Sequence, residues 1–133
     1  MRALILDDEP AIGRVICRVA LSSGFAAEST TDTAAFQSSF SAAPPEVILL
    51  DLQLGSEDGL AQLRFLADQH FSHPVVLMSG YDHRVLASAE RLGRDLGLDI
   101  LASINKPFRA DDLSALFEQL AQRFAALGDD RTA

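Results

Sequence analysis

Cysteine and basic residues are scarce in this sequence, and long hydrophobic runs are missing. The chain has one cysteine, Cys17, so no internal disulfide can form, and a reducing compartment is consistent with that. Cys17 lies in a helical apolar pattern, and we expect it to be a buried free thiol. With 11 Lys and Arg against 19 Asp and Glu, the net charge is −8, and no basic arm or stripe is present. Direct binding to nucleic acid is therefore not expected, because phosphate backbones are bound by clustered basic side chains.

No apolar stretch approaches the length needed to cross a membrane. Only a few residues separate Met1 from the first acidic residue, so the apolar stretch at the N-terminus is too short for a signal peptide. We therefore expect a cytoplasmic protein without membrane contact. Its 133 residues, 48% of them hydrophobic, suffice for a domain with a real core. No internal repeat, low-complexity segment or linker is evident, so one domain is predicted over 1–128, followed by a polar tail at 129–133.

Strand-like and helix-like segments alternate five times along the chain. Strands are predicted at 2–6, 25–29, 47–54, 75–78 and 98–104, each followed by a helix. The Thr31-Asp32-Thr33 segment and Asp58 offer caps for the second and third helices, and Gly128 is expected to end the last one. Such alternation requires right-handed crossovers and a parallel sheet covered on both faces. We predict a flavodoxin-like doubly wound α/β fold with strand order 2-1-3-4-5.

Reactive side chains follow the predicted strands. The apolar run 47–54 brings the carboxylate Asp51 to the carboxyl end of its strand, where the loops of an open α/β sheet converge. Four further residues stand at strand ends: Asp7, Asp8, Ser79 and Lys106. Carboxylates crowded at one edge repel one another unless a cation lies among them, and all-oxygen ligands suit Mg²⁺. Besides the cation, Lys106 supplies a fixed positive charge that can hold Asp51 or an oxygen attached to it.

These residues, in this order and on these elements, resemble the receiver domain of two-component response regulators, of the chemotaxis-regulator kind. The resemblance covers about 2–127 and rests on Asp7-Asp8, Asp51, Ser79 and Lys106-Pro107-Phe108. It implies a phosphoryl relay, in which a histidine kinase or a histidine phosphotransfer protein donates from phosphohistidine to the matching aspartate.

The same resemblance implies roles for the individual residues. Asp51 is the phosphoacceptor, and Ser79 and Lys106 contact the phosphoryl oxygens. Mg²⁺ is bound by Asp8, Asp51 and the backbone carbonyl of Gln53, with Asp7 assisting through water. The protein is then no enzyme toward other substrates, since it catalyses only its own phosphorylation and dephosphorylation.

Elementary chemistry agrees with this assignment. Phosphoryl transfer goes through a loose transition state, so the protein mainly aligns the reactants and neutralises the phosphoryl oxygens. An aspartate is already ionised at pH 7 and needs no general base. The added group brings about −1.5 to −2 charge and strong acceptor oxygens, which a hydroxyl such as that of Ser79 can move to meet. A conformational switch is therefore expected.

Other classes of protein remain to be weighed. An aspartate-nucleophile phosphatase usually has a second acid two residues after the nucleophile, where this chain has Gln53. A flavin or dinucleotide carrier needs a phosphate-binding loop after the first strand, where Asp7-Asp8-Glu9 would repel phosphate. A phosphorylation-independent, receiver-like interaction module is the main alternative, and the complete acidic set argues against it. The arginines Arg14 and Arg18 on the first helix are either a solvated face or a contact for the phosphodonor.

Three departures from the family pattern affect the loops and the switch. Gly55 stands where a proline is common, and the segment from Ser79 to Lys106 is longer than in compact receivers, as in receivers found before cyclic-dinucleotide phosphodiesterase domains. Ser103 stands where an aromatic switch residue would be, and it has no ring to bury. We therefore expect another element to carry the signal, with Tyr81 the nearest candidate. The cognate kinase, the output, the oligomeric state and any continuation of the chain are left open.

Overall fold

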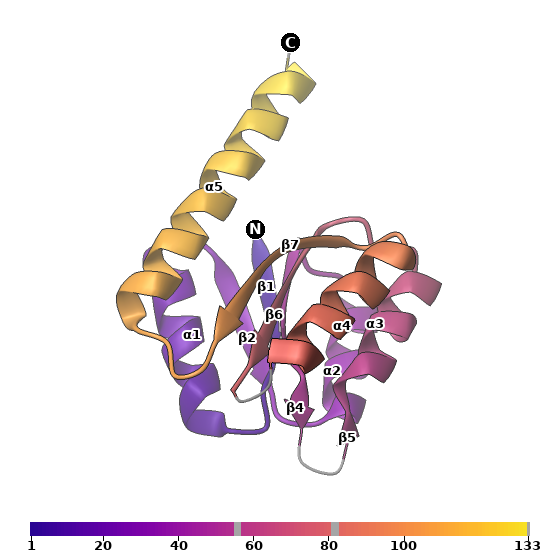
Figure 1. Ribbon diagram of the computed structural model, residues 1–133. Helices are drawn as coiled ribbons and strands as arrows, with labels where there is room; N and C mark the ends of the chain where they lie inside the picture. Colours follow the sequence, from indigo (N-terminus) through magenta and orange to yellow (C-terminus); the bar gives the residue numbers. More distant parts are fainter. Residues whose placement is uncertain (55–56, 81–82, 133) are drawn as a thin grey trace.

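A parallel sheet of five strands forms the centre of the molecule (Figure 1). The computed structural model describes the fold of residues 1–54, 57–80 and 83–132, and the side chains of 1–54, 59–80 and 83–126. The strands are β1 (Arg2–Leu6), β2 (Ala26–Thr30), β3 (Val47–Asp51), β6 (Pro74–Ser79) and β7 (Asp99–Asn105). They lie in the order β2-β1-β3-β6-β7, and every neighbouring pair is parallel. Counted along the chain this is 2-1-3-4-5, which confirms the predicted fold.

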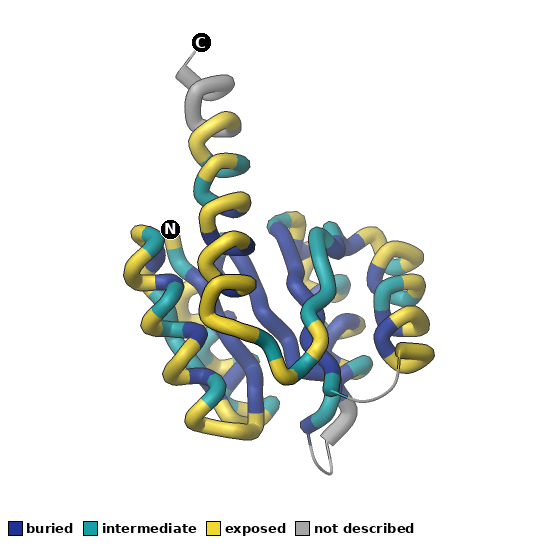
Figure 2. The backbone as a smooth tube through the Cα atoms, turned by 60° about the vertical axis from the view of Figure 1, so that its left-hand side comes forward, coloured by how far each residue is buried: buried dark blue, intermediate teal, exposed yellow. Residues whose placement is uncertain are grey.

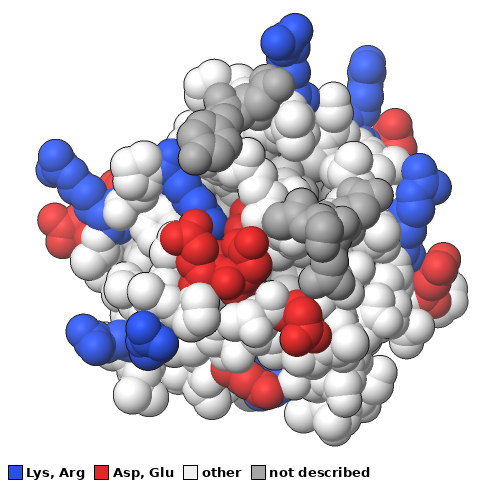
Figure 3. Space-filling model, turned by 90° about the horizontal axis from the view of Figure 1, so that it is seen from below, with Lys and Arg blue, Asp and Glu red and all other residues white. Residues whose placement is uncertain are grey.

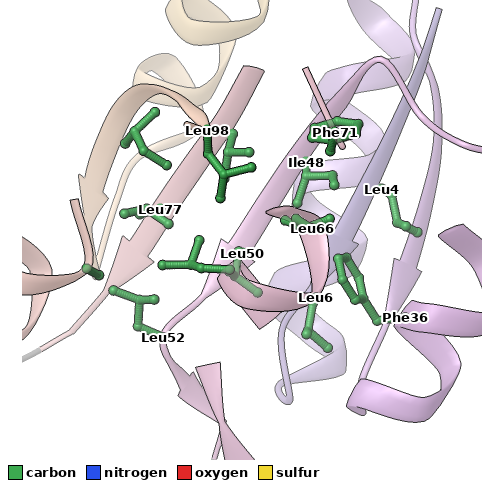
Figure 4. Close-up of a cluster of buried hydrophobic side chains, with 14 of the residues drawn as sticks. Leu4, Leu6, Phe36, Ile48, Leu50, Leu52, Leu66, Phe71, Leu77 and Leu98 are labelled. Carbon is green, nitrogen blue, oxygen red and sulfur yellow. The ribbon is translucent and has the colours of Figure 1, made fainter. Parts of the chain in front are cut away.

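Helices cover both faces of the sheet, as a parallel sheet requires. One face carries α1 (Pro10–Ser22) and α5 (Ala110–Thr132), and the other carries α2 (Thr33–Ala42), α3 (Gly59–Asp68) and α4 (His83–Asp95). Alternate strand residues supply the two cores: Leu50 packs toward α2, α3 and α4, and Leu49 toward α1 and α5. Figure 4 shows the first of these cores, with strand leucines meeting side chains from the helices. The sheet is thus buried between two layers of helices.

The apolar run after the second helix is divided in the structure. The prediction of one strand over 47–54 is wrong, because β3 ends at Asp51 and a short antiparallel pair follows, β4 (Gln53–Leu54) with β5 (Glu57–Asp58). Leu52 and Leu54 are nevertheless buried, so their hydrophobicity reflects core packing outside the main sheet. Gly55 lies outside the described residues.

The expected end of the last helix is also wrong. The helix α5 runs through Gly128 to Thr132. Its described part already extends beyond the sheet (Figure 2). Glycine lowers helix stability by only about 1 kcal/mol relative to alanine, so it does not stop a helix unless the chain also turns there. Phe124 is the last α5 residue packed against the core within the described side chains.

Two further expectations about α1 need correction. The helical spacing of Ile12, Val15 and Val19 predicts one apolar stripe against the sheet, but Val15 is 41% exposed. Cys17 is half-buried, and burial, together with the nearby Glu28 carboxylate, raises the pKa of its thiol. No helix in the described part of the chain has the length and apolarity that crossing a membrane would need.

The start of α2 provides a direct test of the capping prediction. The Asp32 carboxylate accepts a hydrogen bond of 2.7 Å from the backbone N–H of Ala35, satisfying a donor that the helix leaves unpaired. Asp32→Ala should lower the free energy of unfolding by about 1 kcal/mol, measured by urea denaturation. The matched control is Ser38→Ala on the exposed side of the same helix, for which a change below about 0.5 kcal/mol is expected. Equal losses in the two variants would contradict the assignment of the cap.

Candidate functional site

The site lies at the edge of the sheet where the parallel strands end. Figure 3 views this end of the molecule and shows acidic side chains gathered at one place on it. Asp7 follows β1, Asp51 ends β3, and Ser79 ends β6, and all three are buried. Asp8, next along the chain, is exposed. The structure therefore brings together, at one edge, the carboxylates and the hydroxyl that the sequence placed at separate strand ends.

Lys106, directly after β7, holds two of these carboxylates. Its Nζ atom is 2.7 Å from Asp7 Oδ2 and 3.0 Å from Asp51 Oδ2, and Glu9 Oε1 is farther away at 3.9 Å. Burial alone would lower the pKa of Lys106, but the hydrogen bonds and charges of Asp7 and Asp51 outweigh it, and the net pKa is raised. The ammonium group is thus firmly charged at neutral pH.

Asp51 is held at both of its oxygens. The backbone N–H of Gln53 donates to Oδ1 at 2.9 Å, and Lys106 Nζ donates to Oδ2 at 3.0 Å. Burial raises the pKa of Asp51, and the Asp7 charge adds to this, while the Gln53 N–H and Lys106 act in the opposite direction. The net pKa is raised, so ionised Asp51 is costly in the folded protein when nothing else neutralises it.

Three carboxylates form a set that suits a cation. Asp7, Asp8 and Asp51 each offer one oxygen, and these oxygens lie within 4.8 Å of one another. One lysine cannot balance three negative charges, so the set has an excess of negative charge at short range. Oxygen donors of this kind, partly open to water at Asp8, fit Mg²⁺, which binds a few carboxylates and keeps several waters.

Ser79 carries a buried hydroxyl whose hydrogen bonding is incomplete. Its Oγ atom has no hydrogen-bond partner among the described residues, although the residue is only 2% exposed. Buried polar atoms are nearly always paired, so this hydroxyl is available to a ligand that enters the site. The carbonyl of the same residue accepts from the Lys106 N–H at 2.8 Å, which ties the end of β6 to the residue after β7.

Sequence reasoning missed the part that the Gln53 side chain plays. Its Oε1 atom accepts a hydrogen bond of 2.8 Å from the backbone N–H of Gly80, so the loop after β3 is tied to the loop after β6. The close packing at Gly59 was not predicted either. A Cβ there would lie 2.8 Å from Leu52 Cα, so only glycine lets α3 start so close to the β3 loop. Neither contact leaves a periodic signal in the sequence, because both depend on how distant loops meet.

A mostly apolar hollow of about 250 Å³ lies beside the site. It is lined by Ala11, Ile12, Val15, Lys106, Pro107 and Phe108. The hollow thus joins one face of α1 to the segment that carries the site lysine. This explains why Val15 is exposed: it belongs to the wall of a surface hollow and not to the core.

The three histidines of the chain are not part of the acidic set. His73 is 5.8 Å, centroid to centroid, from the Phe71 ring, in a loop that precedes β6 at the opposite end of the sheet. His70 is in the same loop, and His83 begins α4. None of them belongs to the acidic set. Tyr81 lies outside the described residues.

This acidic edge with its lysine, set on a doubly wound sheet, defines the class of the protein. The chain belongs to the response regulator receiver domain family, which it matches over residues 3–118. It is thus a receiver domain of two-component signalling. Receiver domains accept phosphoryl groups from kinases, and they typically bind Mg²⁺.

Individual relatives support this membership. The nitrogen assimilation regulatory protein NtrX of Azorhizobium caulinodans is 32% identical over 120 residues, covering 87% of this chain and 25% of NtrX. The cyclic di-GMP phosphodiesterase RocR of Pseudomonas aeruginosa is 29% identical, covering 92% of this chain and 32% of RocR. A solved response regulator from Colwellia psychrerythraea is 29% identical with a TM-score of 0.80, covering 92% of this chain and 97% of that one. The chain spans about a quarter to a third of the length of these two curated relatives.

Proposed function

We propose that Asp51 accepts a phosphoryl group from the phosphohistidine of a histidine kinase or a histidine phosphotransfer protein. The observation that carries the proposal is the surroundings of one atom, Asp51 Oδ2. It lies 3.0 Å from Lys106 Nζ, beside the acidic pair, at the edge that also holds the unpaired Ser79 hydroxyl. A nucleophile, a fixed cation and a free donor are the parts that phosphoryl transfer needs.

Each residue has a definite task in this reaction. Asp51 Oδ2 attacks phosphorus, the bond from phosphorus to the histidine nitrogen breaks, and the electron pair stays with the imidazole of the donor. Lys106 is within reach of Asp51 and neutralises negative charge as the new bond forms. Ser79 then donates its hydroxyl hydrogen to a phosphoryl oxygen, which gives its buried Oγ atom the partner that it lacks.

The acidic set has its own task, which is to hold Mg²⁺. We propose that Asp8, Asp51 and the Gln53 carbonyl bind the ion directly and that Asp7, held by Lys106 at 2.7 Å, acts through water. When bound, the ion neutralises phosphoryl oxygens in the transition state. Asp7 also keeps Lys106 in place, because its buried carboxylate pairs with the ammonium group.

The phosphodonor is proposed to dock over the hollow beside the site. Ala11, Ile12 and Val15 on α1 and Phe108 beyond Lys106 form an apolar wall, and the exposed Arg14 and Arg18 lie on the same helix. A donor helix that covers this wall would bring its phosphohistidine toward Asp51. Such a partner and the free Cys17 thiol suit the reducing cytoplasm, which we propose as the location.

The receiver unit is proposed to span 1–128, with 129–133 beyond it. Within this unit the chemistry acts only on the protein itself, by phosphorylation and dephosphorylation of Asp51. The output of this unit would pass to a downstream protein or to a fused effector domain.

A small phosphodonor tests this proposal. Incubation with Mg²⁺ and acetyl phosphate should add one phosphoryl group to the intact protein, as measured by mass spectrometry, and hydroxylamine should remove it because the linkage is an acyl phosphate. Chelation of Mg²⁺ by EDTA should prevent the uptake. No mass increase with excess donor would instead favour a phosphorylation-independent interaction module.

A further inference from the structure

The strand β7 contains an irregularity that changes which of its residues face α4. In the pairing with β6, Val75 is opposite Ile100 but Val76 is opposite Ala102, so Leu101 is an extra residue, as in a β-bulge. Ile100 packs in the core toward α4, whereas both Leu101 and Ala102 pack toward α1 and α5. The alternation is therefore shifted by one residue beyond the bulge. This shift directs Ser103 toward α4.

Ser103 meets a carboxylate on that helix. Its Oγ atom donates a hydrogen bond of 2.8 Å to Glu90 Oε1. The other oxygen of Glu90 is 3.5 Å from Arg94 NH1, one turn further along α4. The Glu90 side chain is only 29% exposed, so its contact with Ser103 is partly shielded from water. A hydrogen bond to a charged group in such a place is stronger than one between neutral groups.

The helix α4 also lies close to β7 near the bond between Glu90 and Ser103. A Cβ on Gly93 would lie 2.6 Å from Ile100 Cδ1, so glycine lets α4 sit tightly against the strand. Ile100 is itself buried in the core beneath α4. Near Gly93 the helix is thus seated on β7 by a close apolar contact, and Ser103 adds a polar bond, which unlike apolar packing has directional geometry.

Both partners of this bond are connected to the phosphoryl site. Ser103 lies three residues before Lys106 on the same strand, and α4 begins at His83, shortly after Ser79. The Lys106 N–H donates to the Ser79 carbonyl at 2.8 Å, which ties the two segments together at the site itself. A displacement of Ser79 toward a phosphoryl oxygen would therefore act on α4 at its start, while Glu90 restrains the helix further along.

We propose that the hydrogen bond between Ser103 and Glu90, here called the α4 latch, holds α4 in the unphosphorylated position and opposes its displacement when Asp51 is phosphorylated. The proposal rests on the proposed function of Asp51. It assigns positioning roles to two residues outside the reacting set. It differs from the expectation that another element, with Tyr81 the nearest candidate, carries the signal. Ser103 has no ring to bury, but it has a directional bond to the helix.

Hydrogen exchange of the α4 backbone amides in the unphosphorylated protein tests the latch. In Ser103→Ala and in Glu90→Ala, exchange of the amides from about 88 to 95 should be about fivefold faster than in the natural protein, a ratio that fits a partly shielded bond to a charged group. The double variant should be no faster than either single one, because both remove the same bond. Ser103→Thr keeps the hydroxyl on a residue suited to strands and should restore slow exchange.

Two control variants separate the latch from general effects. Ser88→Ala changes an exposed serine on α4, and Arg94→Ala removes the ion pair with Glu90 but keeps the Ser103 bond. In both variants the α4 amides should exchange at nearly the rate of the natural protein. Unchanged exchange in Ser103→Ala, or additive effects in the double variant, would overturn the proposal.

A second measurement separates this proposal from that for Asp51. Phosphate uptake from acetyl phosphate is measured by intact mass, and the amide NMR shifts of α4 are followed in the same samples. The latch predicts that the fraction of α4 in its phosphorylated position, at equal phosphate content, is greater in Ser103→Ala than in the natural protein. An equal fraction, with phosphate present on both proteins, contradicts the latch alone. A lack of phosphate on either protein contradicts the role of Asp51, and the exchange experiment still decides the latch.

Discussion

Asp51→Asn should reduce phosphate uptake from acetyl phosphate to the background level. Asparagine has nearly the same shape, and its carbonyl oxygen can still accept from the Gln53 N–H, but its amide is no nucleophile for phosphorus. The loss is expected to be complete, because covalent transfer has no route that avoids the nucleophile. Mass spectrometry of intact protein after incubation with Mg²⁺ and donor measures it.

The same substitution should leave the fold intact. The raised pKa of Asp51 means that its ionised form is less favourable in the folded than in the unfolded protein, so at neutral pH this charge lowers stability. Removing it should give a metal-free protein at least as stable as the natural one, by thermal denaturation. Lys106 keeps its ion pair with Asp7 at 2.7 Å in the variant.

Asp68→Asn is the matched control for this experiment. Asp68 is an exposed aspartate at the end of α3, away from the strand ends, and its variant should take up phosphate as the natural protein does. If Asp51→Asn kept natural uptake, the acceptor would be another residue, and peptide mapping of the modified protein would identify it.

The second large effect concerns Asp8 and Mg²⁺. A ligand that binds only the folded protein stabilises it by mass action, by about 2.7 kcal/mol at 100 times its dissociation constant. For a domain of this size each kcal/mol raises the melting temperature by roughly 3–5 °C, so millimolar Mg²⁺ should produce a shift of several degrees. Asp8→Ala removes one of three clustered carboxylates and should abolish both this shift and Mg²⁺-dependent phosphate uptake.

Asp8 is the most informative ligand to remove, because it is exposed and its loss leaves no cavity. Glu9→Gln is the matched control: it removes the next acidic charge along the chain, which does not belong to the clustered set. Its Mg²⁺ response should be close to natural. A melting temperature of the natural protein that is independent of Mg²⁺ would show that the cation site is assigned wrongly. If both variants lost the Mg²⁺-dependent shift in melting temperature equally, the shift would reflect the overall negative charge and not binding by the clustered set.

The order of the elements could be predicted because it follows from local patterns. Apolar runs such as 47–54 indicate buried strands, and helical spacing of apolar residues indicates the covering helices, so the doubly wound sheet was the consistent solution. The set of residues that meet at the site followed in turn, since the carboxyl ends of parallel strands lie at the same edge of a sheet. Asp51, Ser79 and Lys106 were expected together for that reason alone.

The errors arose where tertiary packing outweighed local preference. Leu52 and Leu54 extended the predicted strand because burial, and not sheet pairing, explains their hydrophobicity. Gly128 was expected to end α5, yet the helix continues, because its small helix penalty is easily outweighed. Val15 looked like a core residue, since a helical pattern cannot distinguish the core from the wall of a surface hollow.

The sequence by itself determined the fold class, the strand order and which residues stand at the carboxyl edge of the sheet, because these depend on hydrophobic periodicity and on where the strands end. Only the tertiary structure decided how those residues are connected: the 2.7 Å and 3.0 Å contacts of Lys106, the bond from Gly80 to Gln53, and the bulge that directs Ser103 toward Glu90. The physical reason is that such contacts join segments far apart in the chain, and a shift of one residue in one strand changes which side chains meet.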